Sequence, residues 1–205
     1  MGLYGRYVLP RLLELSCSAR PILRQRAKLV PRASGRVLEV GFGSGLNLPY
    51  YDGARVRRLF ALEPSPQLWS MAAKRVRAAP VQVEPLQAPA EQVPLDDGSI
   101  DTIVVTFTLC SIADTLGALS ELRRVLDPAG RLLFCEHGAA PDASVRRWQR
   151  RLNPVWRALS GGCNLDREVP SLLEQAGFRI QELNTMYIPG WRPASFNYWG
   201  SAARA

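Results

Sequence analysis

Histidine and lysine are scarce in this sequence of 205 residues. His137 is the only histidine, and Lys28 and Lys74 are the only lysines. The formal net charge of +8 therefore comes almost entirely from arginines, which are scattered along most of the chain. A surface that follows nucleic-acid phosphates more often shows a clustered basic stripe with interleaved aromatic residues. The nearest such segment, 20–36, contains no aromatic residue, so we predict no nucleic-acid partner.

Paired cysteines are also missing. The four cysteines are far apart, without a Cys-x-x-Cys pair, at Cys17, Cys110, Cys135 and Cys163. With a single histidine, this spacing matches no usual zinc motif, and it predicts no metal site.

Long hydrophobic runs are absent as well. The apolar part of residues 3–15 is interrupted at Arg6, Pro10, Arg11 and Glu14. No run approaches the roughly 20 residues that cross a bilayer. We therefore expect no signal peptide and reduced thiols in a cytoplasmic protein, with the inner face of the membrane as an alternative location.

The composition is that of an ordinary globular protein, with 47% hydrophobic and 21% charged residues. A chain of this length forms one domain with a short appendage. Near the N-terminus, apolar residues recur at the three-to-four residue spacing of a helix. Pro10 is expected to kink or restart this helix, and a second helical piece is expected from about Pro21 to Leu29. We assign residues 1–32 to a helical cap or membrane-surface helix and residues 33–205 to the main domain.

From residue 36 onwards, predicted strands alternate with predicted helices, which is typical of a doubly wound α/β sheet. The predicted strands are 36–40, 59–62, 81–86, 100–107, 131–136, 179–186 and 195–203, and the main helices are 66–78, 114–126, 143–159 and 168–176. The strand 100–107 reads as buried on both faces and hence central. Pro85 favours an edge position for the strand 81–86.

A glycine cluster follows the first predicted strand, in the segment Glu39-Val40-Gly41-Phe42-Gly43-Ser44-Gly45. Its glycines allow a tight turn and close approach of backbone N–H groups to a ligand. A dinucleotide site requires a further glycine where Leu46 stands. Glu63 ends the second strand, where a carboxylate accepts hydrogen bonds from ribose hydroxyls. Taken singly, these features also suit a structural turn and a solvated acid, but their order on one sheet favours a cofactor site.

The spacing Glu-x-Gly-x-Gly-x-Gly resembles the first motif of Rossmann-like methyltransferases. The stretch from Ala88 to Asp101 contains Ala-Glu-x-x-Pro-Leu-x-Asp-Gly-Ser-Ile-Asp and resembles the ubiquinone and menaquinone biosynthesis type of methyltransferase. This resemblance implies a Rossmann-like, doubly wound seven-stranded sheet, mostly parallel with a C-terminal antiparallel hairpin. It also implies S-adenosylmethionine as cofactor and S-adenosylhomocysteine as product. The cofactor-binding residues that we expect are Glu39, Gly41, Phe42, Gly43, Gly45, Glu63, Pro64, Ala90, Glu91, Thr106, Thr108 and Leu109.

Later segments resemble the methyltransferase-like thiol S-methyltransferases, which carry a membrane-associated N-terminal helix. These segments are 106–111, 134–137, 162–165 with Arg167 and Glu168, and 198–200. The resemblance implies S-methylation of a small hydrophobic thiol. We expect the substrate pocket to include Cys110, Cys163, Asn164, Trp191 and Tyr198.

Methyl transfer to a thiol needs little acid–base chemistry. A thiol has a pKa of about 8.5, so a few per cent of its molecules are already thiolate at neutral pH. His137 is the one candidate catalytic base, and a histidine that only orients a loop is the alternative. Other readings are a phosphatidylethanolamine N-methyltransferase, a quinone C-methyltransferase, or a non-catalytic nucleic-acid or cofactor-binding module suggested by the charge. The N-terminal helix would act either as a lid or as a contact with an anionic membrane, and the oligomeric state stays open.

Overall fold

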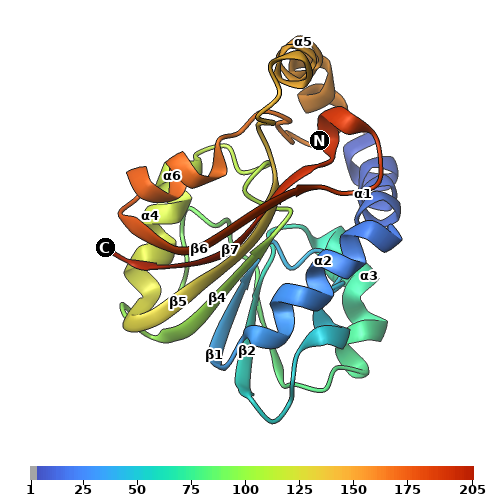
Figure 1. The fold of residues 1–205 in the computed structure, drawn as a ribbon. Coiled ribbons are helices and arrows are strands. Elements are labelled where there is room, and N and C mark those ends of the chain that lie inside the picture. Colours follow the sequence, from blue (N-terminus) through green and yellow to red (C-terminus); the bar gives the residue numbers. More distant parts are fainter. Residues whose placement is uncertain (1–3) are drawn as a thin grey trace.

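The sheet is the centre of the molecule. A computed structural model describes residues 4–205 and contains a seven-stranded sheet of order β3-β2-β1-β4-β5-β7-β6 (Figure 1). Neighbouring strands from β3 to β5 run parallel, whereas β7 pairs antiparallel with both β5 and β6. The strands are β1 Gly35–Val40, β2 Val56–Leu62, β3 Val83–Leu86, β4 Ile100–Thr106, β5 Leu126–His137, β6 Phe178–Tyr187 and β7 Phe196–Arg204. The predicted sheet with its antiparallel hairpin is confirmed, as are the central place of β4 and the edge place of β3.

Helices cover both faces of the sheet (Figure 1). They are α1 Leu9–Cys17, α2 Arg20–Leu29, α3 Pro66–Arg77, α4 Thr115–Val125, α5 Ala143–Leu159 and α6 Val169–Gln175. Shorter helical turns are Tyr4–Val8, Val30–Arg32, Leu48–Tyr50 and Arg192–Ala194. On β4, Ile103 packs in the core shared with α4, and Val104 packs in the core shared with α2 and α3. The strand is therefore apolar on both faces, as a parallel strand between two helical layers must be.

Local chemistry explains where several helices begin. The Asp114 side chain accepts a hydrogen bond from the Gly117 N–H at 2.9 Å and caps α4, as predicted. Pro10 and Pro21 lie in the first turns of α1 and α2, where proline's missing N–H costs nothing. The two prolines thus divide the N-terminal region into separate helices. Within residues 4–205, no helix is both long and apolar enough to cross a membrane.

One strand begins earlier than its sequence indicates. The segment 127–130 is Asp-Pro-Ala-Gly and predicts a turn, but β5 already starts at Leu126. Leu126 pairs with Ile100, and the register then shifts between Ile100 and Thr102. Such an irregularity accommodates proline and glycine within a strand, because the affected residues leave the regular ladder.

Candidate active site

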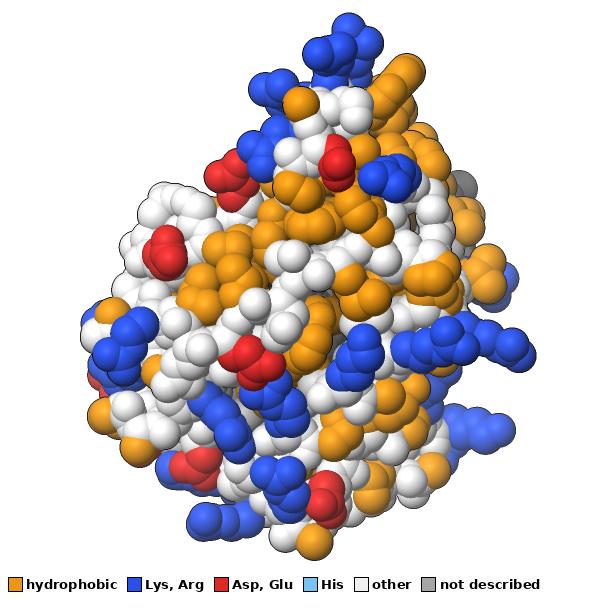
Figure 2. Space-filling model, in the orientation of Figure 1, with side chains coloured by type: hydrophobic (Ala, Val, Ile, Leu, Met, Phe, Trp, Pro, Cys, Tyr) orange, Lys and Arg blue, Asp and Glu red, His pale blue; other side chains and the backbone are white. Residues whose placement is uncertain are grey.

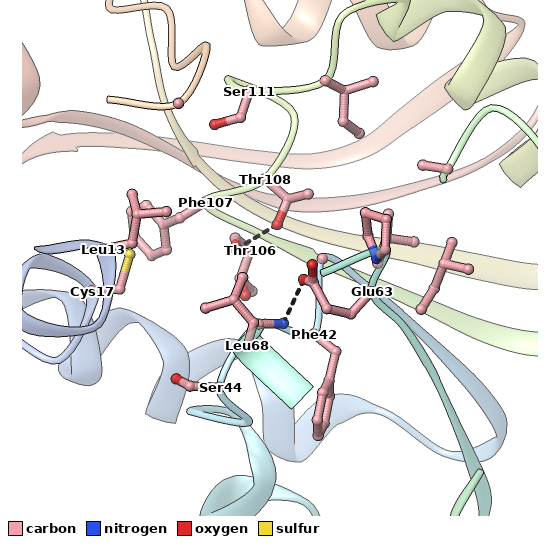
Figure 3. A pocket seen from close by; sticks show the side chains of 18 of the residues that line it. Leu13, Cys17, Phe42, Ser44, Glu63, Leu68, Thr106, Phe107, Thr108 and Ser111 are labelled. Atoms are coloured by element: carbon pink, nitrogen blue, oxygen red, sulfur yellow. Dashed lines mark hydrogen bonds between the residues drawn. The ribbon is translucent and has the colours of Figure 1, made fainter. Parts of the chain in front are cut away.

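A pocket of about 410 Å³ opens at the carboxyl ends of β1, β2 and β4 (Figure 3). The strand order reverses at this place, since β2 and β4 lie on opposite sides of β1, and open α/β sheets bind ligands at such a switch point. The volume lies within the range of about 300–1,000 Å³ for ligand pockets. Its walls come from the loop after β1, the end of β2, the segment 88–91, the loop after β4 and helix α1.

The glycine loop adopts a backbone that other residues rarely adopt. Gly41, Gly43 and Gly45 have φ values of +67°, +59° and +78°, in the region that favours glycine. A Cβ on Gly41 would lie 2.3 Å from the Thr108 side chain. A Cβ on Gly43 would meet only a backbone oxygen of the loop, at 3.8 Å. Gly43 therefore leaves open space beside the pocket, whereas Gly41 allows two loops to touch.

Glu63 holds this loop and points into the pocket from the end of β2 (Figure 3). Its Oε2 accepts the Gly43 N–H at 2.9 Å, and its Oε1 accepts the Ser65 N–H at 2.9 Å. Burial raises the pKa of Glu63, and the two backbone donors oppose that rise. Each carboxylate oxygen has further lone-pair capacity for a ligand hydroxyl.

Other predicted cofactor residues also border the pocket. The lining includes Gly41, Phe42, Gly43, Pro64, Ala90, Glu91, Thr106 and Thr108. Glu39, Gly45 and Leu109 do not line it among the described residues. Gly45 ends the loop, where a Cβ would lie 3.0 Å from the Leu48 side chain.

Beneath the loop, Glu39 belongs to a buried polar network. Its carboxylate accepts hydrogen bonds from Tyr51 Oη at 2.7 Å and Asn47 Nδ2 at 3.0 Å. Arg26 Nη1 of α2 donates to Asn47 Oδ1 at 2.9 Å and to Thr106 Oγ1 at 2.7 Å. Burial raises the pKa of Glu39 to about 7, against the lowering effect of Tyr51 and Arg26. The network ties α2 to the ends of β1 and β4. The places of Arg26 and Tyr51 in it were not predicted, because neither residue belongs to a recognisable motif.

The loop after β4 begins in a strained conformation. Phe107 has φ +54°, which is uncommon for a residue with a side chain and costs of order 1–3 kcal/mol. Glu136, at the end of the neighbouring β5, accepts the N–H groups of Thr108 at 2.6 Å and Leu109 at 3.0 Å. Leu109 thus contributes through its backbone, and the fully buried Glu136 fixes the loop that forms one pocket wall.

Helix α1 closes the pocket from the side of the N-terminal helices. Leu9, Leu13, Glu14 and Cys17 line the pocket, and Figure 3 shows Leu13 and Cys17 facing it. Glu14 Oε1 forms an ion pair of 2.7 Å with Arg75 of α3. Its other oxygen accepts a hydrogen bond from Ser44 of the glycine loop. Helix α1 therefore forms one wall of the pocket and is joined to the glycine loop and α3.

The predicted catalytic and substrate residues lie beyond the pocket lining. Cys110 and Cys163 are buried beside His137, whose Nε2 lies 3.1 Å from Cys163 Sγ. The hydrogen bond with Cys110 lowers the pKa of Cys163 most, and the hydrogen bond with His137 and the charge of His137 lower it further. Burial lowers the pKa of His137, but the Cys163 hydrogen bond and charge outweigh burial and raise it. The wide spacing of the cysteines in the sequence predicted no metal site, yet the fold brings Cys110, His137 and Cys163 together.

Three further residues that we predicted in the substrate pocket make contacts within the protein. Asn164 donates from Nδ2 to the Cys110 carbonyl at 2.8 Å. The buried Tyr198 donates its hydroxyl to the Ala139 carbonyl. Trp191 is 49% exposed and packs against Trp156, with ring centroids 5.4 Å apart. In the described chain, none of the three lines the pocket.

The pocket suits a cationic adenosine compound. Among the described residues, its charged lining consists of Glu14, Glu63, Glu91 and Arg26, so carboxylates outnumber guanidinium groups there. The open side of Gly43 leaves room for a ligand against the backbone, and the apolar Pro64, Leu68 and Ala90 provide a surface for a flat ring. These features fit the expected sulfonium cofactor.

Comparison with known proteins identifies the class. The family model described as "Methyltransferase domain" matches residues 38–134. A SAM-dependent methyltransferase structure from Thermotoga maritima covers 98% of both chains with a TM-score of 0.66 and 22% identity. A geranyl diphosphate methyltransferase in complex with SAM covers 89% of this chain and 84% of its own, with a TM-score of 0.68 and 14% identity. The chain belongs to the class I S-adenosylmethionine-dependent methyltransferases.

Within this class, the chain resembles particular enzymes. It is 37% identical to the human thiol S-methyltransferase TMT1B over 180 residues, which cover 84% of this chain and 72% of that enzyme. The human TMT1A is 34% identical, over 82% of this chain and 71% of its own length. A demethylmenaquinone methyltransferase from Thermus thermophilus is 30% identical, over 82% of this chain and 79% of its own length. The protein is therefore an enzyme that uses S-adenosylmethionine as methyl donor.

Proposed function

We propose that this methyltransferase S-methylates small hydrophobic thiols. The proposal rests on the chemistry of the pocket, which has an apolar wall and no lining histidine among the described residues. The apolar wall comes from Leu9 and Leu13 of α1 together with Phe107 and Ile112 of the loop after β4. Similarity to two thiol S-methyltransferases supports the same substrate class.

Two of the carboxylates that line the pocket already have other partners. Glu14 is bonded to Arg75 and Ser44, and Glu63 accepts two backbone N–H groups. A phenol or quinol carbon requires a strong base, whereas a thiol is partly ionised at neutral pH. A thiol is thus the acceptor that demands least from these residues.

When bound, S-adenosylmethionine supplies an electrophilic methyl group for in-line transfer. The residues of this chain hold the reactants and exclude water. Glu63 and the glycine loop fix one end of the pocket, and the loop that Glu136 anchors forms the wall beside it. Helix α1 covers the site, so that the thiol meets the methyl group in an apolar space.

The N-terminal helices also present an apolar outer face, which we propose lies on an anionic membrane surface. Val8, Leu12 and Leu15 are 45%, 46% and 71% exposed. Exposed arginines of α5 gather at the same end of the molecule (Figures 1 and 2). Apolar side chains flanked by arginines are typical of helices at lipid interfaces. Flotation with phosphatidylglycerol vesicles but not with phosphatidylcholine vesicles is expected, and equal recovery with both would contradict the proposal.

A methylation screen tests the function. The purified protein is incubated with labelled S-adenosylmethionine and with simple alkyl thiols, phosphatidylethanolamine or quinol precursors. Label transfer to the thiols is expected. Labelling of phosphatidylethanolamine alone would identify a phospholipid N-methyltransferase, and labelling of the quinol alone would identify a quinone C-methyltransferase. Salt-sensitive nucleic-acid binding without transfer to any acceptor would favour a non-catalytic module.

A further inference from the structure

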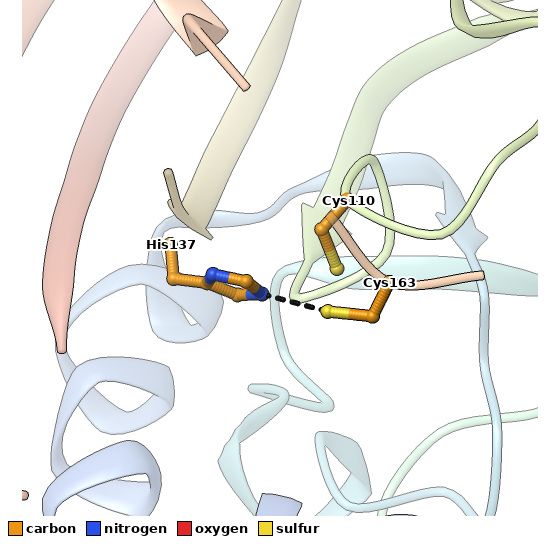
Figure 4. Close-up of side chains that lie close together, drawn as sticks. All are labelled: Cys110, His137 and Cys163. Carbon is orange, nitrogen blue, oxygen red and sulfur yellow. Dashed lines mark hydrogen bonds between the residues drawn. The ribbon is translucent and has the colours of Figure 1, made fainter. Parts of the chain in front are cut away.

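Three potential metal ligands from distant parts of the sequence meet beside the pocket. Cys110 follows β4, His137 ends β5, and Cys163 lies in the loop after α5. Their two sulfur atoms and one ring nitrogen all lie within 4.8 Å of one another. Figure 4 shows the three side chains pointing toward a common point. Both cysteines are nearly inaccessible, with exposed fractions of 3% and 7%.

Hydrogen bonds that do not involve these side chains hold the three segments in place. The Asn164 N–H and Nδ2 both donate to the Cys110 carbonyl at 2.8 Å. The buried Gln149 donates from Nε2 to the carbonyls of Gly138 and Leu165, each at 2.9 Å. The first set joins the Cys110 and Cys163 segments, and the second joins the His137 and Cys163 segments. The ligand atoms are therefore preorganised by the backbone around them.

We propose that Cys110, His137 and Cys163 bind one Zn²⁺ ion and leave its fourth position open. In a tetrahedral zinc site, with Zn–S distances of about 2.3 Å and Zn–N distances of about 2.0 Å, neighbouring ligand atoms lie roughly 3.5–3.8 Å apart. The separation of 3.1 Å between His137 Nε2 and Cys163 Sγ and the 4.8 Å limit for the group bracket these values. Three protein ligands with an open position are the pattern of catalytic zinc sites.

The chain segments that carry the two cysteines border the pocket. Ser111, which follows Cys110, lines the pocket, and so do Ser160 and Gly161 just before Cys163. The cluster is thus one residue layer behind the pocket wall. The Cys17 thiol also lines the pocket and lies outside the group of three.

Resting on the proposed function, we assign the substrate thiol as the fourth ligand. The thiol loses its proton to solvent as its sulfur coordinates Zn²⁺, because zinc binding deprotonates thiols. The sulfur then forms a bond to the methyl carbon while the carbon–sulfonium bond breaks, giving a thioether and S-adenosylhomocysteine. Zn²⁺ with three thiolates and one neutral imidazole carries a charge of −1, which complements the sulfonium. The thioether product carries no charge and binds zinc more weakly than a thiolate, which allows release.

Metal binding is measured without reference to turnover. Full-length protein without a histidine tag is reduced, stripped of metal and titrated with Zn²⁺ against a coloured chelator. One Zn²⁺ per chain is expected. Cys110→Ser, His137→Gln and Cys163→Ser are expected to weaken binding by more than about 100-fold. The matched control is Cys135→Ala, since Cys135 is equally buried but lies outside the cluster, and it should retain the ion.

Substitution with Co²⁺ tests the open position. Tetrahedral thiolate-ligated Co²⁺ gives visible bands and a charge-transfer band, and addition of an alkyl thiol without cofactor should shift them. Cys17→Ser should leave the spectrum of the thiol-free protein unchanged; a changed spectrum would mean a closed site with a fourth protein ligand and would overturn the open position. Circular dichroism and binding of S-adenosylhomocysteine show that each variant is folded.

The outcomes separate this inference from the proposed function. Absence of stoichiometric Zn²⁺ binding, or a Cys110–Cys163 disulfide that persists under reducing conditions, overturns the metal site whatever the enzyme methylates. Unchanged thiol methylation by the metal-stripped protein overturns the role of zinc and leaves the thiol substrate intact. Zinc binding with a cobalt spectrum that responds to thiols, but without thiol methylation, supports the site and contradicts the proposed acceptor.

Discussion

Glu14 of α1 and Arg75 of α3 form an ion pair of 2.7 Å across the glycine loop. Arg75 also donates to the Ser44 carbonyl at 3.0 Å, and Glu14 accepts a hydrogen bond from the Ser44 hydroxyl. Helix α1, the glycine loop and α3 are thus joined at Ser44. This small polar cluster is one of the contacts that hold α1 beside the pocket.

Glu14→Gln is expected to weaken the contact of α1 with the glycine loop and α3, which lets a bound ligand leave the pocket more easily. Partly exposed ion pairs contribute about 0–1 kcal/mol, so the affinity for S-adenosylhomocysteine should fall by no more than about tenfold while its dissociation rate rises. Stopped-flow measurement of ligand release checks this result. Glu168→Gln is the matched control, because Glu168 pairs with Arg146 away from the pocket. An unchanged dissociation rate for Glu14→Gln would mean that α1 does not retain the ligand.

Glu63→Gln is expected to weaken cofactor binding by about 10- to 100-fold, because hydrogen bonds to a charged group contribute about 1.5–3 kcal/mol. Isothermal titration calorimetry with S-adenosylhomocysteine measures the loss. Glu84→Gln serves as the control, since Glu84 lies on the adjoining β3 and pairs with Arg58. Equal affinity of the Glu63 variant and the wild-type protein would show that this carboxylate does not contact the ligand.

Alanine at two glycines is expected to give different defects. Both positions have positive φ, which costs about 1–2 kcal/mol for a residue with a Cβ. Gly41→Ala also brings Cβ to 2.3 Å from the Thr108 side chain, so it should lower the melting temperature more. Gly43→Ala fills open space beside the pocket and should reduce ligand affinity with a smaller loss of stability. Thermal melts compare the stability of the two variants, and calorimetry compares their ligand affinity. A lower melting temperature for Gly43→Ala than for Gly41→Ala would contradict the loop geometry.

Glu39 should make the protein less stable as the pH rises. Burial raises its pKa to about 7, so the folded state binds this proton more tightly than the unfolded state. The resulting stability is complete below the ordinary carboxyl pKa and is lost as the pH rises through about 7. Between pH 5.5 and 8 the loss is at most about 2 kcal/mol. Urea unfolding of Glu39→Gln should show a smaller dependence on pH than wild type. The exposed Glu174→Gln should retain the wild-type dependence; the same slope in all three would refute the assignment.

The order of strands and helices could be predicted because the sequence repeats one local pattern. Continuous apolar runs such as 103–105 mark strands buried on both faces, and Asp114 marks the start of α4 by its capping chemistry. The start of β5 could not be predicted, since Asp127 to Gly130 carry turn signals and only the pairing of Leu126 with Ile100 makes the segment extended.

The places of the glycine loop and Glu63 beside the pocket could be predicted, because they depend on neighbours in sequence or on strand ends. Arg26 and Glu14 were missed, because a charged residue on an amphipathic helix gives no sign of which remote groups it meets. All three of Cys110, His137 and Cys163 were assigned to the active site, but their arrangement as potential metal ligands was missed for the same reason. Their sequence spacing resembles no motif, and only the strand order places the ends of β4 and β5 side by side.

The place of β7 has a consequence for biosynthesis. The ribosome delivers β6 before β7, yet β7 lies between β5 and β6 in the finished sheet. Until residues 196–204 are made, the edge of β5 that pairs with β7 stays open, although β4 lies on its other side, and β6 cannot dock. Between the synthesis of β5 and that of β7, the nascent chain therefore exposes unpaired strand edges, which makes chaperone protection valuable at that stage.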